Sequence, residues 1–281
     1  MKVFVTGHKG MLGTDLMNLL AEEKHDPTGA DIDTLDICDL EAVMEAVGET
    51  KPDAVVNCAA YTNVDACETD ADNAYRINAI GPKNLAIASN HYAVPLVHIS
   101  TDYVFDGESD RPYLEGDFPN PQSVYGKSKL FGEENVRSLA NRYFIFRTQW
   151  LYGKNGKNFV KTMLALAETS EYLTVVDDQS GSPTYTKDLA KVIVQLIGTR
   201  AYGTYHATNA GICTWHAFTK QIMELAGVDI EVRPCTTAEF PRPAKRPRYA
   251  PLENFNLKLC GFATPRPWQE ALKDYLREEG R

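Results

Sequence analysis

The stretch that decides the fold lies at the start of the chain: Val3-Phe4-Val5-Thr6-Gly7-His8-Lys9-Gly10-Met11-Leu12-Gly13. It opens with apolar residues typical of a buried strand, and three glycines spaced three apart follow. Leu16, Leu19 and Leu20 then recur with helical period. A strand, a glycine turn and a helix in this order form the dinucleotide-binding βα unit. Gly7 allows the tight turn, Gly10 lets the backbone approach a pyrophosphate, and Gly13 lets helix and strand pack closely.

The next hundred residues repeat this alternation of strand and helix. Short apolar runs at residues 54–57, 96–100 and 144–147 alternate with helical patterns at 74–91 and 128–140. Alternation on this scale predicts an α/β fold of the Rossmann type, a doubly wound parallel sheet. Ligands of such sheets bind beyond the carboxyl ends of the strands. We therefore look for the site there.

The pattern changes after Tyr152. Helices are predicted at residues 159–168 and 187–197, and a stretch rich in proline and arginine at 233–251 is predicted to be neither strand nor helix. We expect residues 1–152 to be mainly the dinucleotide-binding core. Residues 153–281 should form mainly a smaller C-terminal substrate-binding lobe, with some segments returning to the core.

Composition narrows the partners and the compartment. The chain has 281 residues and a formal net charge of −9, which argues against nucleic acid as a partner. No apolar run could span a bilayer and no signal-peptide pattern opens the chain, so no membrane association is expected. Six scattered cysteines lack disulfide or metal-binding spacing, and no histidine pair resembles a metal site. We expect a cytoplasmic protein that binds no metal.

The cofactor preference is open at this stage. Asp31 lies 18 residues past Gly13, where a second strand should end. An acid there binds the adenosine ribose hydroxyls and repels a 2′-phosphate, which favours NADH. Lys9, inside the glycine turn, would instead attract that phosphate. Both NADPH and NADH therefore remain candidates.

Two segments predict the chemistry. The strand at 96–100 runs into Ser100-Thr101-Asp102-Tyr103, and Tyr125 and Lys129 stand four residues apart on one helix face. An ammonium beside a phenol lowers its pKa from about 10 toward neutrality. The pattern predicts hydride transfer between nicotinamide and a carbonyl carbon, with Tyr125 protonating the oxygen, Lys129 tuning Tyr125 and Thr101 holding the substrate oxygen. No Gly-x-Ser-x-Gly elbow supports a hydrolase.

Longer strings resemble a known family. They are Asn57-Cys58-Ala59-Ala60-Tyr61-Thr62, the segment from His98 through Ser100-Thr101-Asp102-Tyr103-Val104-Phe105 to Gly107, Tyr125-Gly126-Lys127-Ser128-Lys129-Leu130, Arg147-Thr148-Gln149-Trp150-Leu151-Tyr152-Gly153, Asp177-Asp178-Gln179, Tyr205-His206 and Arg246-Pro247. Together they resemble the dTDP-4-dehydrorhamnose reductases, which are extended short-chain dehydrogenases, over essentially the whole chain. The resemblance implies reduction of the 4-keto group of a nucleotide-linked 6-deoxyhexose by NADPH or NADH, of the type dTDP-4-dehydro-L-rhamnose to dTDP-L-rhamnose.

The resemblance also implies site residues. The catalytic set is Thr101, Tyr125 and Lys129, and the substrate set is Thr101, Asp102, Tyr103, Trp150 and Arg246. The cofactor set is Gly7, Gly10, Met11, Leu12, Gly13, Asp31, Asp39, Leu40, Ala59, Ala60, Tyr61, Thr62, Tyr125 and Lys129. The expected partner is a nucleotide sugar. A homodimer is compatible with the family, although no interface residues can be assigned.

Several alternatives stay open. Asp39 fits the adenine edge or a solvated loop, and Trp150 fits a deoxyhexose ring, a base or a core position. The basic residues Arg242, Lys245, Arg246 and Arg248 fit a diphosphate clamp or a solvated loop. After Arg246-Pro247 the family pattern continues with a serine that this chain lacks, which leaves the sugar and the nucleotide open. The rival functions are a nucleotide-sugar epimerase or dehydratase and a non-catalytic NAD(P)-binding regulatory subunit.

Overall fold

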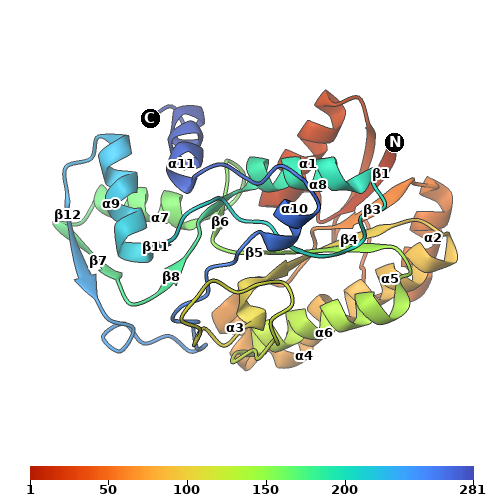
Figure 1. Ribbon diagram of the computed structural model, residues 1–281, viewed down its shortest axis with the longest axis horizontal. Helices are drawn as coiled ribbons and strands as arrows, with labels where there is room; N and C mark the ends of the chain where they lie inside the picture. The colour runs from red at the N-terminus through yellow and green to blue at the C-terminus, as the bar shows by residue number, and fades with distance from the viewer.

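The computed structural model describes residues 1–281 and centres on a parallel sheet of six strands (Figure 1). The strand order is β10-β5-β4-β3-β1-β2. The strands are β1 (Lys2–Thr6), β2 (Asp26–Ala30), β3 (Ala54–Asn57), β4 (Leu96–Thr101), β5 (Tyr143–Thr148) and β10 (Gly203–His206). The order reverses between β1 and β3, and a ligand is expected outside the carboxyl ends at such a switch point. The predicted fold class is confirmed.

Side-chain alternation along the strands gives the sheet two buried faces. In β1, Val3 and Val5 pack with α1 (Met11–Glu22) and α8 (Thr186–Ile197). Phe4 points to the opposite face and packs with α2 (Leu40–Thr50), α5 (Gly81–His91) and α6 (Val124–Leu139). The two helical layers lie on opposite sides of the sheet in Figure 1. Burial on both faces explains why these strands are continuous apolar runs.

A second, smaller core lies beside the sheet, at the left of Figure 1. It gathers apolar side chains of α7 (Phe159–Ala167), β7 (Tyr172–Val176), α9 (Trp215–Ala226) and α11 (Trp268–Glu278). The parallel pair of β7 and β12 (Glu231–Cys235) covers one side of it. The C-terminal part of the chain does not stay in this lobe, because α8 and β10 both join the sheet and its core.

Three details differ from the sequence expectations. The first residues of the 233–251 stretch extend β12, which is stabilised by pairing with β7, so that part of the prediction was wrong. The helix expected at 74–91 is built from α4 (Ala71–Tyr75), a π-helical turn at Arg76–Ile80 and α5. Helix α6 starts four residues earlier than expected, because Ser123 caps it by accepting the Gly126 N–H. None of the helices combines the length and the apolar composition of a membrane span.

Candidate functional site

The glycine turn after β1 is sterically fixed at two of its three glycines. Gly7 has φ +70°, and a Cβ there would lie 2.5 Å from the backbone nitrogen of Ala59. A Cβ on Gly13 would lie 2.2 Å from the Gly7 carbonyl oxygen. Gly10 meets only that same oxygen, at 3.2 Å, and its other side is open. The turn therefore packs against itself at Gly7 and Gly13 and presents bare backbone to a ligand at Gly10.

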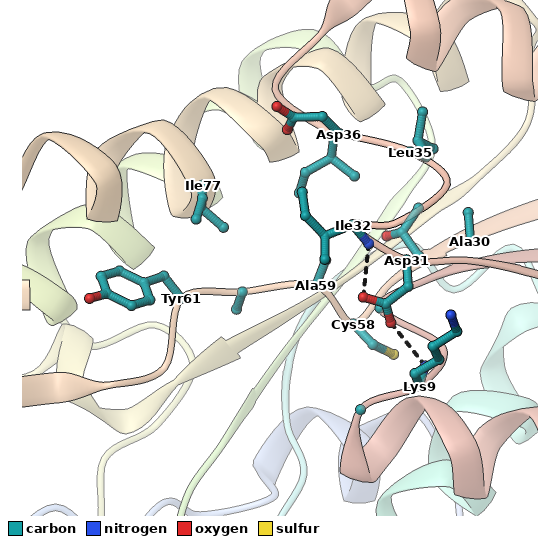
Figure 2. Close-up of a pocket in the computed structure, with 15 residues that line it drawn as sticks. Lys9, Ala30, Asp31, Ile32, Leu35, Asp36, Cys58, Ala59, Tyr61 and Ile77 are labelled. Atoms are coloured by element: carbon teal, nitrogen blue, oxygen red, sulfur yellow. Dashed lines mark hydrogen bonds between the residues drawn. The ribbon is translucent and has the colours of Figure 1, made fainter. Parts of the chain in front are cut away.

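A cleft of about 500 Å³ lies over this turn, at the switch point of the sheet (Figure 2). It is lined by residues that follow β1, β2 and β3 and by one residue of the π-helical turn: Thr6, Gly7, Lys9, Gly10, Ala30, Asp31, Ile32, Leu35, Asp36, Ile37, Cys58, Ala59, Ala60, Tyr61 and Ile77. Gly10 is the N-cap of α1 and offers its first turn no side-chain acceptor. Unpaired N–H groups at a helix N-terminus bind phosphate, so the cleft fits a dinucleotide.

Asp31 and Lys9 meet in this cleft without forming an ion pair with each other. The Asp31 carboxylate accepts the backbone N–H of Lys9 at 3.0 Å and of Ile32 at 2.9 Å (Figure 2). The Lys9 ammonium pairs with Asp33 instead. Asp31 is thus fixed at the end of β2, as expected, while the exposed Lys9 head group keeps a charge near the same position.

Several residues predicted to bind the cofactor do not line this cleft. The Asp39 carboxylate caps α2 by accepting the N–H groups of Glu41 and Ala42, and exposed Leu40 begins that helix. Leu12 is buried in the core between α1 and the sheet. The Met11 side chain lies next to Gly153. Thr62 is exposed beyond Tyr61. For these five residues contact with the cofactor stays a prediction.

Tyr125 stands between this cleft and a second cavity. It is 8% exposed and packs in a small cluster with Tyr61, which lines the cleft, and Tyr103, which lines the cavity. Its ring meets that of Tyr103 edge to face at 5.3 Å between centroids. Burial raises the pKa of its phenol, while the neighbouring Thr101 side chain opposes the rise. Tyr125 therefore holds its proton at neutral pH.

Thr101 and Asp102 form a fixed pair at the end of β4. The Thr101 hydroxyl donates to Asp102 Oδ1 at 3.0 Å and accepts the N–H of Tyr103 at 3.2 Å. Burial raises the pKa of Asp102 to about 7, so this carboxyl titrates close to neutrality. The pair lies at the border of the second cavity, since Asp102 and Tyr103 both line it.

Lys129 does not contact Tyr125 in the way the sequence suggested. Its ammonium donates to the Ile99 carbonyl oxygen at 2.5 Å. Burial lowers its pKa to about 8, although Glu133 and Cys58 act to raise it. The pKa of Tyr125 is raised by burial and, to a smaller extent, by Asp102, Tyr103 and Cys67, and it is lowered by Thr101. In this arrangement the expected tuning of the phenol by Lys129 has no direct contact to support it.

A buried ion cluster beneath the site was not predicted from the sequence. Glu133 receives Arg147 Nη2 at 2.8 Å and Arg137 Nη2 at 2.5 Å. The Ser100 hydroxyl also donates to it at 2.5 Å. Burial would raise the pKa of Glu133, but the two arginines and Ser100 outweigh it and lower the pKa to about 2. The cluster ties α6 to β4 and β5, and Ser100 directly precedes Thr101 while Glu133 follows Lys129 by four residues on α6.

Asn78 was also missed. It lies in the π-helical turn, where its Oδ1 accepts the Tyr61 N–H at 2.8 Å. Its amide donates to the Tyr61 carbonyl at 3.0 Å and to the Ser128 hydroxyl at 3.1 Å. It thereby connects the cleft to the helix of Tyr125 and Lys129. A π-turn frequently marks a functional site, but nothing in the local sequence announces one.

The second cavity has a volume of about 540 Å³ and is lined from both lobes. Its walls are Asp102, Tyr103, Trp150, Phe159, Thr162, Met163, Leu166, Thr174, Val175, Val176, Gln179, Ser180, Trp215, Phe240, Arg242, Arg246, Pro247 and Ala250. Trp150 has φ +49°, a left-handed backbone that is costly for a bulky residue. Its indole stacks on that of Trp215, with centroids 3.5 Å apart. An apolar wall with a few charged groups suits an amphipathic ligand.

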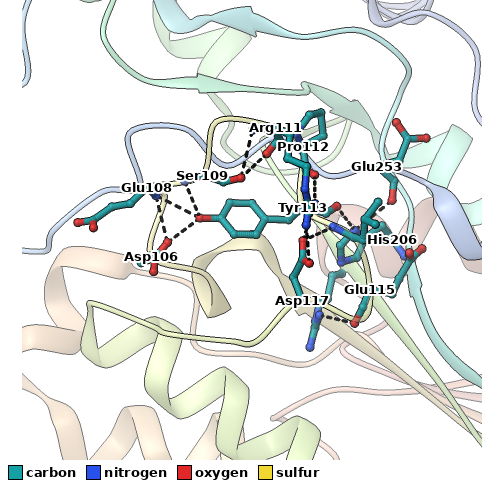
Figure 3. Close-up of polar contacts among 12 residues, drawn as sticks. Asp106, Glu108, Ser109, Arg111, Pro112, Tyr113, Glu115, Asp117, His206 and Glu253 are labelled. Carbon is teal, nitrogen blue, oxygen red and sulfur yellow. Dashed lines mark hydrogen bonds and ion pairs between the residues drawn. The ribbon is translucent and has the colours of Figure 1, made fainter.

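Figure 3 draws a hydrogen-bonded network that joins the segment around Tyr113 to His206 and Glu253. The Tyr113 hydroxyl donates to Asp106 at 2.6 Å and accepts the N–H of Glu108 at 3.1 Å. His206 Nδ1 lies 3.0 Å from the Tyr113 carbonyl and 3.1 Å from that of Glu253. These contacts hold residues 249–253 against the end of β10, where Ala250 reaches the cavity. Tyr205-His206 therefore belongs to the framework.

Known proteins resemble this chain along its full length. The family model described as the RmlD substrate binding domain matches residues 1–280. The spore coat polysaccharide biosynthesis protein SpsK of Bacillus subtilis (strain 168) is 44% identical over 277 residues, covering 99% of this chain and 97% of that protein.

Two solved structures are also similar. A dTDP-4-dehydrorhamnose reductase of Clostridium acetobutylicum has a TM-score of 0.98 and 49% identity, and the match covers 100% of both chains. The dTDP-4-dehydrorhamnose reductase of Bacillus anthracis, solved in complex with NADP, has a TM-score of 0.97 and 45% identity, with 99% of both chains covered.

Proposed function

Because this chain belongs to the RmlD substrate-binding-domain family, we propose that it is an NAD(P)H-dependent oxidoreductase acting on a nucleotide sugar. The reaction is reduction of the 4-keto group of a nucleotide-linked 6-deoxyhexose, of the type dTDP-4-dehydro-L-rhamnose to dTDP-L-rhamnose. The observation that carries the proposal is the place of Tyr125, buried between Tyr61 of the cleft and Tyr103 of the cavity. In this proposal the phenol acts between a dinucleotide in the cleft and a sugar in the cavity.

The residues of the cleft fit a nicotinamide dinucleotide. The open backbone at Gly10 and the uncapped first turn of α1 would hold the pyrophosphate, and Asp31 would hold the adenosine ribose. The exposed Lys9 leaves room for a 2′-phosphate as well. When bound, the reduced nicotinamide supplies the hydride for the keto carbon.

The side chains supply the proton and its placement. As the keto group is reduced, negative charge develops on its oxygen, and Tyr125 donates its phenolic proton there to give the alcohol. The raised pKa of Tyr125 keeps that proton in place until the charge develops. The Thr101 hydroxyl neighbours this phenol, and its hydrogen bonds to Asp102 and to the Tyr103 N–H fix its position.

Lys129 acts from below the cleft. It is 2% exposed and anchored on the Ile99 carbonyl, with Cys58 of the cleft wall among the groups that act on its charge. Its pKa of about 8 leaves it mainly charged at pH 7. No contact joins this ammonium to Tyr125, so in this proposal its positive charge favours the developing negative charge through the field of the site and not through a hydrogen bond to the phenol.

The cavity supplies the substrate site. The apolar wall of Trp150, Phe159 and Trp215 suits a deoxyhexose or base face, and Arg242 and Arg246 suit a diphosphate. A nucleotide sugar combines these two kinds of surface. The reducing cofactor favours a cytoplasmic reaction. The expected homodimer is tested by molar mass in solution, since one chain has 31.3 kDa.

The first test follows the absorbance of reduced nicotinamide with enzymatically generated dTDP-4-dehydro-L-rhamnose. NADH and NADPH are compared at equal concentration. We expect stoichiometric oxidation of the cofactor and one sugar product. Tyr125→Phe should lower kcat by about 10²- to 10⁴-fold, because it removes the proton donor. Its Kd for NADPH should stay that of the wild type. Normal turnover by Tyr125→Phe would place the proton donor elsewhere.

The same assay separates the rival functions. An epimerase or dehydratase returns the hydride within one cycle, so it would convert sugar without net oxidation of added NADPH. A regulatory subunit would bind NADPH and turn over no sugar.

A further inference from the structure

One carboxylate that the reaction itself does not use contacts both arginines of the substrate cavity. Asp65 lies in the first turn of α3 (Val64–Thr69), three residues after Thr62. Its side chain is only 18% exposed. Asn63 caps the helix by accepting the Ala66 N–H, so the Asp65 carboxylate is not needed for capping and points to other partners.

Those partners all come from the loop that closes the cavity. Asp65 Oδ2 accepts Arg242 Nη2 at 2.6 Å and Arg242 Nε at 3.0 Å. Asp65 Oδ1 accepts Arg246 Nη1 at 2.7 Å and the Ala244 N–H at 3.2 Å. One carboxylate thus fixes two guanidinium groups and the backbone between them.

Both arginines keep donors for a ligand. Arg242 Nη1, Arg246 Nε and Arg246 Nη2 have no protein acceptor, since the remaining bond of Arg246 runs from Nη1 to the Ala244 carbonyl. Within this group of three side chains, two positive charges face one negative charge, which leaves a net charge of +1. Charge-assisted hydrogen bonds from fixed guanidinium groups suit the oxygens of a diphosphate.

The helix that carries Asp65 also contacts the helix of the proton donor. Glu68 accepts the N–H of Val124, the first residue of α6, at 2.8 Å. Helix α3 therefore lies between the loop of the two arginines and the helix that carries Tyr125 and Lys129. A carboxylate on this helix can set the arginines relative to the reacting centre.

We propose that Asp65 is a positioning residue, which holds Arg242 and Arg246 in place for the diphosphate of the nucleotide sugar. This inference rests on the proposed function for the nature of the substrate. Its physical basis is preorganisation: a guanidinium that is already fixed loses less side-chain entropy when the ligand arrives. The opposite role can be tested as well. If Asp65 only competed with the diphosphate for the two arginines, its removal would strengthen substrate binding.

The test is Asp65→Asn in the full chain, with dTDP as a probe that needs no turnover. We expect the Kd for dTDP, measured by calorimetry, and the KM for the sugar nucleotide to rise about tenfold, while kcat and the Kd for NADPH change less than twofold. Glu108→Gln is the matched control, since it removes a carboxylate that faces Lys245 of the same loop at 3.6 Å. The control should bind dTDP as the wild type does.

A second variant guards against a folding defect. Asp65→Glu keeps the charge and moves it by one methylene, so it should retain part of the dTDP affinity that Asp65→Asn loses. An unchanged or tighter Kd for dTDP in both variants overturns the inference. If wild-type protein binds dTDP but reduces no sugar, the proposed function fails and the positioning role is still judged by the dTDP affinities.

Discussion

The two ligand spaces of this molecule are built in different ways. The cofactor cleft is built around the glycine turn and the segments that follow β1, β2 and β3, whose order is fixed by the sheet. The substrate cavity is made of large side chains from both lobes, and its arginines come from a loop more than ninety residues beyond Trp150. A local sequence pattern can therefore specify the first space, whereas the second depends on long-range packing.

This difference has a consequence for substitutions. A side chain added at Gly7 or Gly13 has to move the main chain, so it should affect both binding and folding. A change in the cavity removes one wall of a side-chain site, so it should affect one ligand only. A titratable residue at the border between the two spaces, such as Asp102, should change the free energy of unfolding and its dependence on pH.

The largest effect is expected at Gly13. In Gly13→Ala the added Cβ would lie 2.2 Å from the Gly7 oxygen and 2.7 Å from the Cα of His8, so backbone must shift. We expect the Kd for NADPH to rise about 100-fold, which is about 2.7 kcal/mol, with a lowered Tm. Fluorescence titration and thermal unfolding measure both. Gly116→Ala is the control, because a Cβ there meets nothing within 4 Å. Wild-type NADPH affinity in Gly13→Ala would contradict the backbone account of the cleft.

An intermediate effect is expected at Trp150. Trp150→Ala and Trp150→Gly should both raise the KM for the nucleotide sugar by about tenfold, which is about 1.4 kcal/mol, and leave the Kd for NADPH unchanged. Since Trp150 has φ +49°, glycine removes a strain that alanine keeps. Trp150→Gly should therefore be more stable than Trp150→Ala by about 1 kcal/mol in the free energy of unfolding, which thermal unfolding would show as a higher Tm. Equal loss of NADPH and sugar affinity would place Trp150 in a shared framework.

The smallest effect concerns Asp102, at the border. Its folded-state pKa of about 7 exceeds the ordinary value of 3.8, so the folded protein prefers the protonated carboxyl. The wild type should therefore lose stability as the pH rises from about 4 to about 7, and stay at the lower level above that range. Asp102→Asn lacks this titration and keeps an acceptor for Thr101. We expect it to be more stable than the wild type at pH 8 and about equally stable at pH 4. A gain of equal size at both pH values would mean that Asp102 ionisation does not cause it.

The same contrast explains what the sequence could predict. Gly7, Gly10, Asp31 and Tyr61 follow strands in order, so their meeting in one cleft follows from the parallel sheet. The spacing of Tyr125 and Lys129 predicted that both lie on one helix, and both lie in α6, whereas their catalytic roles stay a prediction. The role of Asp65 could not be predicted, because its partner Arg242 lies 177 residues away. The Glu133–Arg137 pair has a recognisable helical spacing of four residues, but the contact of Glu133 with Arg147 on a neighbouring strand has no local pattern. Asn78 depends on a π-turn that the helical periodicity does not reveal. The basic stretch predicted an anion site but not the carboxylate that orders it.

The order in which the chain builds the two lobes affects folding during synthesis. The chain forms α7 and β7 of the small lobe before it returns to the sheet with β10. β10 is the last strand to join the sheet and ends at His206, and α10 (Phe255–Leu259) packs its Leu257 on the same core. A nascent chain therefore leaves the ribosome with an incomplete sheet edge until more than two thirds of the protein has been synthesised. A protease cut in the 236–251 loop would likewise release neither lobe, because each lobe holds chain from both sides of the cut. The molecule should assemble late and come apart as one unit.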